Sequence, residues 1–189
     1  MTADPITYQP MLDFEPTTLH SARLLLRPLR ASDAGPLSLY ASDERVATMT
    51  TSIPHPYPPG AADAYIAASL SGRSPEIIWA MDATPDNGAE LIGVVAVKRA
   101  KAELGYWVGP PFWGTGYASE AAIRICEHLM TDHKLERLNA SVFFDNPASR
   151  SVLQHCGFRQ TGDAWQYSVA RQMEVPAVTF ELTKLPAAA

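Results

Sequence analysis

The chain alternates short apolar runs with longer stretches in which apolar residues recur every three or four positions. Short apolar runs bounded by turn residues predict strands, and the longer recurring pattern predicts helices. On this basis we expect strands at 23–28, 76–81, 91–97, 102–108, 138–144, from 158 onward and at 178–182. Helices are expected from 32 to about 40, around 65–70, from 115 to 133, and from Asn146 to Gly157.

The order of these elements predicts how the sheet is connected. Three consecutive strands between 76 and 108 are joined by short links, and Asn87-Gly88 is a strong hairpin signal. We therefore expect an antiparallel meander. The strand, helix and strand between 102 and 144 imply one parallel pairing, because such a crossover joins parallel neighbours. The expected fold class is α/β, with a mixed and mostly antiparallel sheet.

The chain length and the proline content indicate the domain organisation. The 189 residues suit one domain spanning 1–189. Residues 1–20 contain three prolines and no clear period, so we expect 1–17 to form an N-terminal arm. Residues 185–189 are expected to be a tail. The segment 52–60 holds four prolines, which excludes a regular element there.

Composition limits the partners that we expect. The net charge of −5 argues against nucleic acid, because phosphate binding needs a basic stripe. Cys126 and Cys156 form no pattern and are interpreted as reduced, buried thiols. The histidines and acids lack metal-ligand spacing, so we expect no metal. The N-terminus lacks a signal-peptide core, and no apolar run approaches the roughly 18 residues that cross a bilayer. We expect a cytoplasmic protein without membrane contact.

The segment 108–118 has the strongest chemical signal. An apolar strand runs through a turn containing Gly114 and Gly116 directly into a helix. Turn N–H groups, the unpaired N–H groups of a first helical turn and the helix dipole together favour an anion such as a diphosphate. The alternative is a tight turn without a ligand. A dinucleotide motif would need glycine at 119, where Ser119 stands, and the Gly-Lys-Ser/Thr ending of a Walker A loop is absent.

Three blocks of the chain resemble one family. Glu103-Leu-Gly-Tyr-Trp-Val and Phe112-Trp-Gly-Thr-Gly-Tyr-Ala-Ser-Glu-Ala121 resemble the coenzyme-binding motif of GNAT acetyltransferases. Asn146 to Phe158 and Thr18 to Leu37 resemble the later helix and the opening strand and helix of the RimJ/RimL-like branch. The similarity spans about 18–184. Pro111 replaces a Gln or Arg that many GNAT members have, a departure that is common in this branch.

The resemblance implies a fold and a coenzyme site. The fold would be a GNAT fold of about seven strands flanked by about four helices, and the co-substrate would be acetyl-CoA. The diphosphate would be held by the backbone amides of Phe112, Trp113, Gly114, Thr115, Gly116, Tyr117 and Ala118. Val108 would pair its main chain with the pantetheine arm, between splayed strands at 102–108 and 138–144. Asn146 and Ser149 would line the thiol end.

Two residues are candidates for catalysis. Glu103 could take a proton from the acceptor ammonium, directly or through water; alternatively it is a strand-edge glutamate facing water. Ser149 could protonate the leaving thiolate, as the resemblance implies; alternatively it satisfies a backbone group in the first helical turn. Strand alternation separates Glu103, Gly105 and Trp107 from Leu104, Tyr106 and Val108. The sequence leaves open which face is the cleft.

The acceptor pocket is expected to use aromatic side chains. The candidates are His55, Tyr57, Trp79, Tyr106 and Trp107. Aromatic walls suit an amine, although each of these residues could instead pack in the core. We expect transfer of acetyl from acetyl-CoA to a primary amine, on a protein N-terminus or a small molecule, by direct attack in a ternary complex. The alternatives are a non-catalytic acyl-CoA-sensing module and, more distantly, a nucleotide-binding protein. The oligomeric state is open, a homodimer included.

Overall fold

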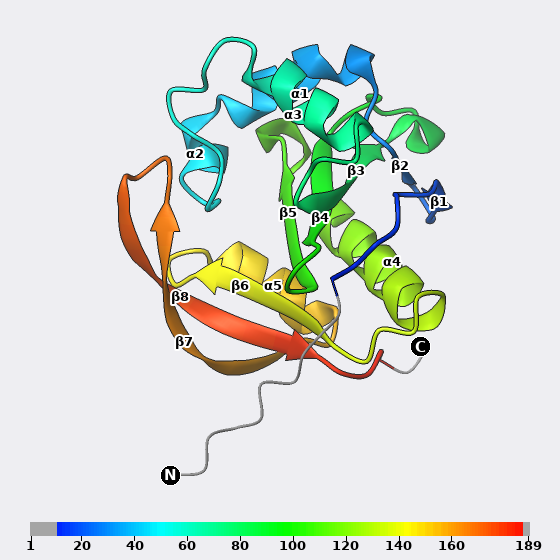
Figure 1. Ribbon diagram of the computed structural model, residues 1–189, viewed down its shortest axis with the longest axis vertical. Coiled ribbons are helices and arrows are strands. Elements are labelled where there is room, and N and C mark those ends of the chain that lie inside the picture. The colour runs from blue at the N-terminus through cyan, green and yellow to red at the C-terminus, as the bar shows by residue number, and fades with distance from the viewer. Residues whose placement is uncertain (1–10, 187–189) are drawn as a thin grey trace.

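The computed structural model describes residues 11–186 as one mixed sheet with helices on both faces (Figure 1). Within these residues the sheet has eight strands in the order β1-β2-β3-β4-β5-β6-β8-β7. The strands are β1 (Leu19–His20), β2 (Leu25–Arg27), β3 (Glu76–Asp82), β4 (Gly93–Lys98), β5 (Glu103–Val108), β6 (Leu138–Phe143), β7 (Arg159–Ser168) and β8 (Met173–Leu182).

Five α-helices and three short 3-10 segments connect the strands in this part of the chain. The α-helices are α1 (Ala34–Ala41), α2 (Glu44–Ala47), α3 (Ala61–Leu70), α4 (Tyr117–Thr131) and α5 (Pro147–His155). The 3-10 segments are η1 (Ala31–Asp33), η2 (Thr84–Asp86) and η3 (Pro110–Phe112). The α/β class and the mostly antiparallel sheet predicted from the sequence are therefore confirmed, with β1 and α2 added to the predicted elements.

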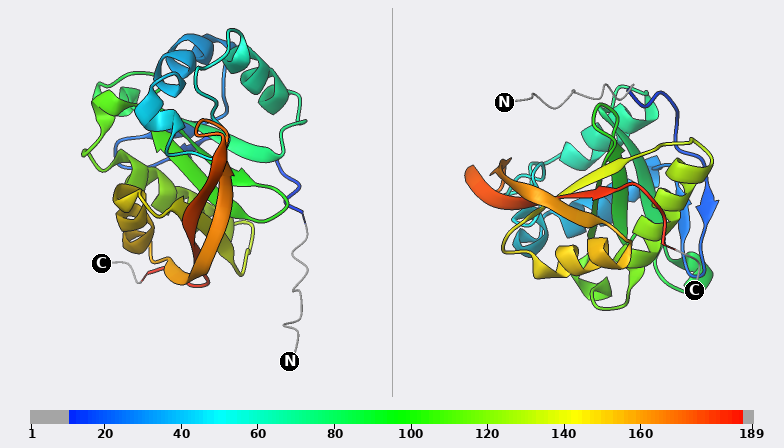
Figure 2. Two further views of the ribbon diagram at one scale, coloured as in Figure 1. Left: turned by 90° about the vertical axis from the view of Figure 1, so that its left-hand side faces the viewer. Right: turned by 90° about the horizontal axis from the view of Figure 1, so that it is seen from below.

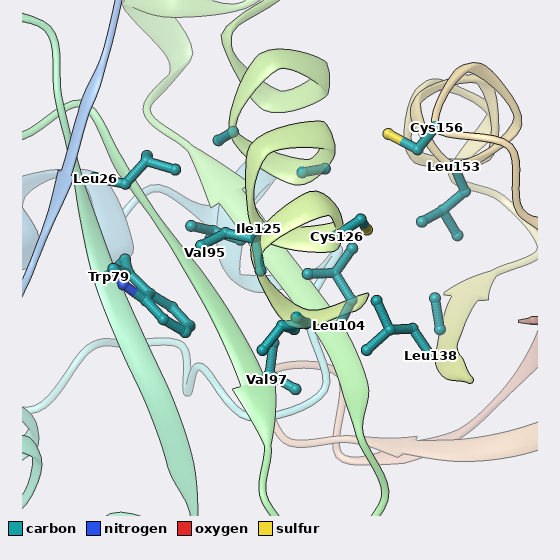
Figure 3. Close-up of a cluster of buried hydrophobic side chains, with 14 of the residues drawn as sticks. Leu26, Trp79, Val95, Val97, Leu104, Ile125, Cys126, Leu138, Leu153 and Cys156 are labelled. Carbon is teal, nitrogen blue, oxygen red and sulfur yellow. The ribbon is translucent and has the colours of Figure 1, made fainter. Parts of the chain in front are cut away.

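The two faces of the sheet bury separate apolar clusters. On one face α4 packs on the central strands, and its Ile125 belongs to the same buried cluster as Val95 and Val97 (Figure 3). On the other face, residues of α1 and α3 cover alternate positions of β3 and β4, including Ile78, Ala80, Val94 and Ala96. The period-two alternation of β3 and β4 thus sends neighbouring residues to different layers.

The sheet divides between β5 and β6, which form its parallel pair. Their register contains only Glu103 with Asn139 and Leu104 with Ala140. Beyond these two pairs β5 stays with β4, while β6 turns toward β8 (Figure 1). The splaying that the family resemblance implied is therefore present, and it leaves the second half of β5 without a strand neighbour on this side.

Several boundaries differ from the predicted ones. β8 begins at Met173, not at 178, and Pro176 lies inside it. Proline is normally excluded from central strands because it has no N–H to donate. Pro176 is tolerated because the β6 ladder starts only at the next residue, Ala177, opposite Phe143. The Asn87-Gly88 turn follows η2 in a longer connection, so it is not a two-residue hairpin.

The predicted arm and tail lie partly within the described residues. Leu12 and Phe14 pack against the α4 side of the core, so this part of the arm is structured. Leu185 also contacts that core. Residues 1–10 of the predicted arm and residues 187–189 of the predicted tail lie outside the described residues. Between residues 11 and 186, no helix is long and apolar enough to cross a membrane.

Candidate functional site

A single cavity of about 1210 Å³ occupies the gap between β5 and β6 and reaches both layers of the fold. Side chains from α1, α3, β4 and the segment 48–54 line one part, and the first turns of α4 and α5 line another. Because β5 has no strand neighbour beyond Leu104 on this side, the cavity passes through the sheet. It contains Glu103, Gly105 and Trp107 from one face of β5, and Tyr106 and Val108 from the other. The sequence left open which face of β5 lines the cleft, and residues of both faces line this cavity.

The glycine turn before α4 exposes a set of backbone donors. Gly114 and Gly116 adopt left-handed backbone angles, with φ of 74° and 85°, which favour glycine. Gly116 caps α4 without a side-chain hydrogen bond. Within residues 11–186, the N–H groups of 114–119 donate to no other group. Unpaired donors at a helix N-terminus form a site for an anion.

Two side chains hold this turn in place. The carboxylate of Glu120 accepts hydrogen bonds from the backbone N–H and Nε of Arg23 and from the hydroxyl of Ser21, at 2.7–2.8 Å. Burial favours the neutral form of Glu120, but these hydrogen bonds outweigh it and lower its pKa. Arg23 also donates to the carbonyl of Thr115 at 3.0 Å. Glu120 is therefore a structural residue that ties the 21–24 segment to the first turn of α4.

The end of β5 presents main-chain groups to the gap. The carbonyl of Ala102 accepts from Asn139 of β6, and successive residues of a strand point their main-chain groups to opposite sides. The N–H and C=O groups of Tyr106 and Val108 therefore face the gap, beyond the last pair with β6. The carbonyl of Val108 accepts the indole N–H of Trp113 at 2.6 Å. The remaining groups can bind an extended ligand with amide groups, as the prediction for Val108 requires.

The N-terminus of α5 brings Ser149 to Tyr106. Asn146 caps the helix by accepting the N–H of Ser149 at 3.1 Å, and Pro147 follows as the first helical residue. The hydroxyl of Tyr106 lies 2.9 Å from the Oγ of Ser149 and 3.1 Å from its carbonyl oxygen. Burial raises the pKa of Tyr106, so its phenol stays protonated. The two hydroxyl groups form a protonated pair beside the gap.

Glu103 lies at the start of β5 and carries an ion pair. Its Oε1 is 2.6 Å from Nζ of Lys98, and its side chain is 15% exposed. Lys98 lies opposite Glu103 on β4, and Glu76 lies opposite Lys98 on β3. All three side chains line the cavity. Glu103 is thus in the cavity as predicted, but it shares a charged row with two residues that the sequence interpretation passed over.

The aromatic residues predicted for the acceptor pocket divide into two groups. Tyr57, Tyr106 and Trp107 line the cavity. Trp79 does not: it is fully buried on the α4 face of the sheet, and its indole N–H donates to the carbonyl of Thr17 (Figure 3). The prediction for Trp79 is wrong, because the alternation of β3 sends it into the core. His55 is not among the cavity-lining residues.

Other cavity residues were not identified from the sequence. Arg45 of α2 lines the cavity and places its guanidinium 5.4 Å from the centre of the Trp113 ring. Gln166 of β7 also lines it and donates to Ser141 of β6 at 2.6 Å. Glu76 is an acid at the start of an apolar strand, and a charge in such a strand was the available signal. Arg45 and Gln166 gave no comparable signal.

The turn of the long β7–β8 hairpin (Figure 2) contacts the segment that follows α2. Val169 donates its N–H to the carbonyl of Thr51. Arg171 donates to the carbonyl of Thr48 at 2.7 Å and forms an ion pair with Asp145 at 2.7 Å. The arginine therefore joins the segment after α2, the hairpin and the loop before α5.

Comparison with known proteins identifies relatives. The family model described as an acetyltransferase (GNAT) domain matches residues 23–159. The uncharacterized N-acetyltransferase p20 of Bacillus licheniformis is 29% identical over 175 residues, which cover 88% of this chain and 96% of that protein. The ribosomal-protein-serine acetyltransferase of Escherichia coli strain K12 is 34% identical over 74 residues, or 36% of this chain and 41% of that protein.

A solved structure has the same fold. It is the microcin C7 self-immunity acetyltransferase MccE in complex with acetyl-CoA and AMP, with a TM-score of 0.73 and 15% identity. The match covers 86% of this chain and 93% of that one. At this identity the likeness concerns the fold alone.

Proposed function

Since this chain belongs to the GNAT family of acetyltransferases, we propose that it transfers acetyl from acetyl-CoA to a primary amine. The acceptor is a protein N-terminus or a small molecule, and it attacks directly in a ternary complex. The observation that carries this proposal is the continuity of one cavity. It joins the free amides at 114–118, the gap beside β5 and the Tyr106–Ser149 pair.

The coenzyme fits the part of the cavity nearest α4 and α5. A diphosphate binds the free N–H groups of 114–118, where the helix dipole adds partial positive charge. Phe112 and Trp113 flank that turn and line the cavity. The pantetheine amides pair with the main chain of Tyr106 and Val108 in the gap. The thioester then lies near Ser149, whose position is fixed by the Asn146 cap.

The acceptor occupies the opposite part of the cavity, where Tyr57 and Trp107 form walls. A lysine-like amine has a pKa near 10.4 and an α-amino group one near 8, so both are largely protonated at neutral pH. Glu103 accepts the proton from the ammonium group, directly or through water. The neutral amine attacks the carbonyl carbon of the thioester, a C–N bond forms, and the C–S bond breaks. The Tyr106–Ser149 pair donates a proton to the departing thiolate, and the second proton lost by the acylated nitrogen returns through water to that pair.

An acceptor screen tests this proposal. The protein is mixed with acetyl-CoA and a panel of amines that includes N-terminal peptides and small amines, and free thiol and acetylated product are measured together. Stoichiometric appearance of both with one class of amine supports the transferase. Tight acetyl-CoA binding with no product from any amine would favour an acyl-CoA-sensing module. Thermal stabilisation by ATP or NAD, but not by acetyl-CoA, would favour a nucleotide-binding protein.

A further inference from the structure

Glu76 stands apart from the other charged residues of the cavity. It begins β3, and its Cα partner on β4 is Lys98, whose own partner on β5 is Glu103. Directly paired residues of neighbouring strands project to the same face, which is the face covered by α1 and α3. The backbone of Glu76 therefore lies two strands away from that of β5, about 10 Å at the usual inter-strand spacing.

The other charges that line the cavity are paired. Arg45 contacts Asp43 at 2.8 Å, Asp145 contacts Arg171 at 2.7 Å, and Lys98 contacts Glu103 at 2.6 Å. For Glu76, no ion pair is formed and no hydrogen bond reaches its carboxylate from anywhere in residues 11–186. The row of Glu76, Lys98 and Glu103 consequently has a net charge of −1 when all three are ionised.

The surroundings of Glu76 make this charge costly. Burial raises the pKa of Glu76, and Glu103 adds to the rise, whereas Lys98 opposes it. Tyr65 of α3 is close enough for Glu76 to raise its pKa in turn, after the larger effect of burial. Glu76 is half-buried, and a partly desolvated carboxylate without hydrogen bonds is stabilised when a cation or a donor reaches it. The cavity provides access for such a group from the ligand side.

We infer that Glu76 binds a second cationic group of the acceptor, so that this enzyme favours amines carrying another positive charge a short chain away. This inference rests on the proposed function and assigns the class of its acceptor. The reacting amine lies over β5 near Glu103, and the second cation lies at the β3 end of the row. Tyr57 also lines the cavity and offers an aromatic ring, a surface that also attracts cations.

Matched amines test the inference. Acetylation of 1,5-diaminopentane is compared with that of 1-aminopentane, which has the same chain without the second charge. A second pair, alanyl-lysine amide and alanyl-norleucine amide, presents the same chemistry on a peptide and distinguishes a free diamine from an N-terminus. We expect kcat/KM to favour the charged member of one pair by about tenfold or more, since tenfold corresponds to about 1.4 kcal/mol. Equal values within both pairs would overturn the inference.

A substitution assigns the preference to Glu76. Glu76→Gln keeps the shape and removes the charge, so the preference should fall to near unity, mainly through a higher KM for the charged amine. Glu174→Gln, an exposed position of β8, is the matched control and should keep the preference. A preference that survives Glu76→Gln would also overturn the inference. Acetyl-CoA binding by the variant, measured by calorimetry, shows that it is folded.

Direct binding separates this inference from the proposed function. Calorimetric titration of 1,5-diaminopentane and of alanyl-lysine amide into the protein with coenzyme A bound requires no turnover. Binding of either that depends on Glu76, without acetylation of any amine, would support the acceptor site and refute the transferase. Acetylation that does not depend on Glu76 or on the second charge would support the transferase and refute the acceptor site at Glu76. If neither Glu76-dependent binding nor acetylation is observed, the transferase and the acceptor site are both refuted.

Discussion

The phenol hydroxyl of Tyr106 lies 2.9 Å from the Oγ of Ser149, which places a β5 residue in contact with the first turn of α5. The contact spans the gap that β6 leaves when it turns away from β5. Burial raises the pKa of the Tyr106 phenol, so the phenol keeps its proton near neutral pH. We interpret the Tyr106–Ser149 pair as the group that protonates the departing thiolate.

Removal of either hydroxyl tests this interpretation. Tyr106→Phe and Ser149→Ala should each lower kcat, by roughly 100-fold if protonation of the thiolate limits the rate. The KM for acetyl-CoA should change much less, because the cavity walls remain. Steady-state kinetics with both substrates varied gives this split. Tyr167→Phe is the control, since Tyr167 is 52% exposed on β7, and a loss of rate there equal to that of Tyr106→Phe would contradict the assignment.

The ion pair of Glu103 with Lys98 leads to a second prediction. If Glu103 receives the proton of the ammonium group, Glu103→Gln should lower kcat/KM for the acceptor most at low pH, where a larger fraction of the amine is protonated. A pH–rate profile of the variant and the wild type measures this. A profile that keeps its shape and height would assign Glu103 to structure, as the partner that holds Lys98.

The backbone angles of Gly114 separate the effects of shape and charge at the turn before α4. Any side chain at φ of 74° is strained, so Gly114→Gln should weaken acetyl-CoA binding. Gly114→Glu adds a negative charge beside the diphosphate and should weaken binding at least about tenfold further. Isothermal titration calorimetry compares the two dissociation constants. Equal constants would place the diphosphate elsewhere.

Gly105 forms part of the cavity wall in the middle of β5. It is exposed although it lies in a central strand, and a Cβ atom built on it would meet nothing within 4 Å. Gly105→Leu should therefore fill the acceptor side of the cavity and raise the KM for the acceptor by roughly tenfold or more, with a smaller change for Gly105→Ala. Acetyl-CoA affinity serves as the control. An acceptor KM that does not respond to side-chain size would place the acceptor elsewhere.

The turn and the helix starts of this protein follow from local sequence. Asn146-Pro147 carries a cap and a first-turn proline in adjacent positions, and Gly114 and Gly116 supply the backbone angles of the turn before α4. Such signals depend on a few neighbouring residues, so one sequence is enough to read them. No residue in β5 or β6 specifies where their pairing stops. The splaying of the two strands was therefore implied only by the resemblance.

The features that could not be predicted from the sequence depend on pairing between distant segments of the chain. Trp79 and Glu76 lie in the same strand at positions of opposite parity, and only the burial of each face decides that the tryptophan enters the core while the glutamate enters the cavity. The row that makes Glu76 informative depends on its register with Lys98 and Glu103 across three strands. The contact of Tyr106 with Ser149 likewise joins residues 43 positions apart.

The acid stability of the fold depends on a buried ionic cluster away from the cavity. The guanidinium of Arg27 binds Asp33 at 2.9 Å and Asp82 at 2.8 Å, and all three side chains are at most 4% exposed. Burial favours the neutral form of Asp82, but hydrogen bonds from Thr84 and Arg27 outweigh it and lower its pKa. A carboxyl with a lowered folded pKa stabilises the fold above its unfolded pKa, near 3.9, and that contribution is lost as pH falls through the folded pKa.

Arg27→Met should therefore lower the free energy of unfolding at neutral pH, and this loss should become smaller as the pH falls. Two buried carboxylates would lose their cation, which costs about 3–5 kcal/mol in the free energy of unfolding. Without Arg27 the protonation of these two carboxylates becomes favourable. The difference in the free energy of unfolding between variant and wild type should therefore narrow as pH falls from 7 toward 4. Urea unfolding at several pH values measures both effects. Arg45→Met, which removes an exposed partner of Asp43, is the control and should leave the unfolding midpoint nearly unchanged. A gap between Arg27→Met and the wild type that stays constant with pH would show that Arg27 acts through packing instead of charge.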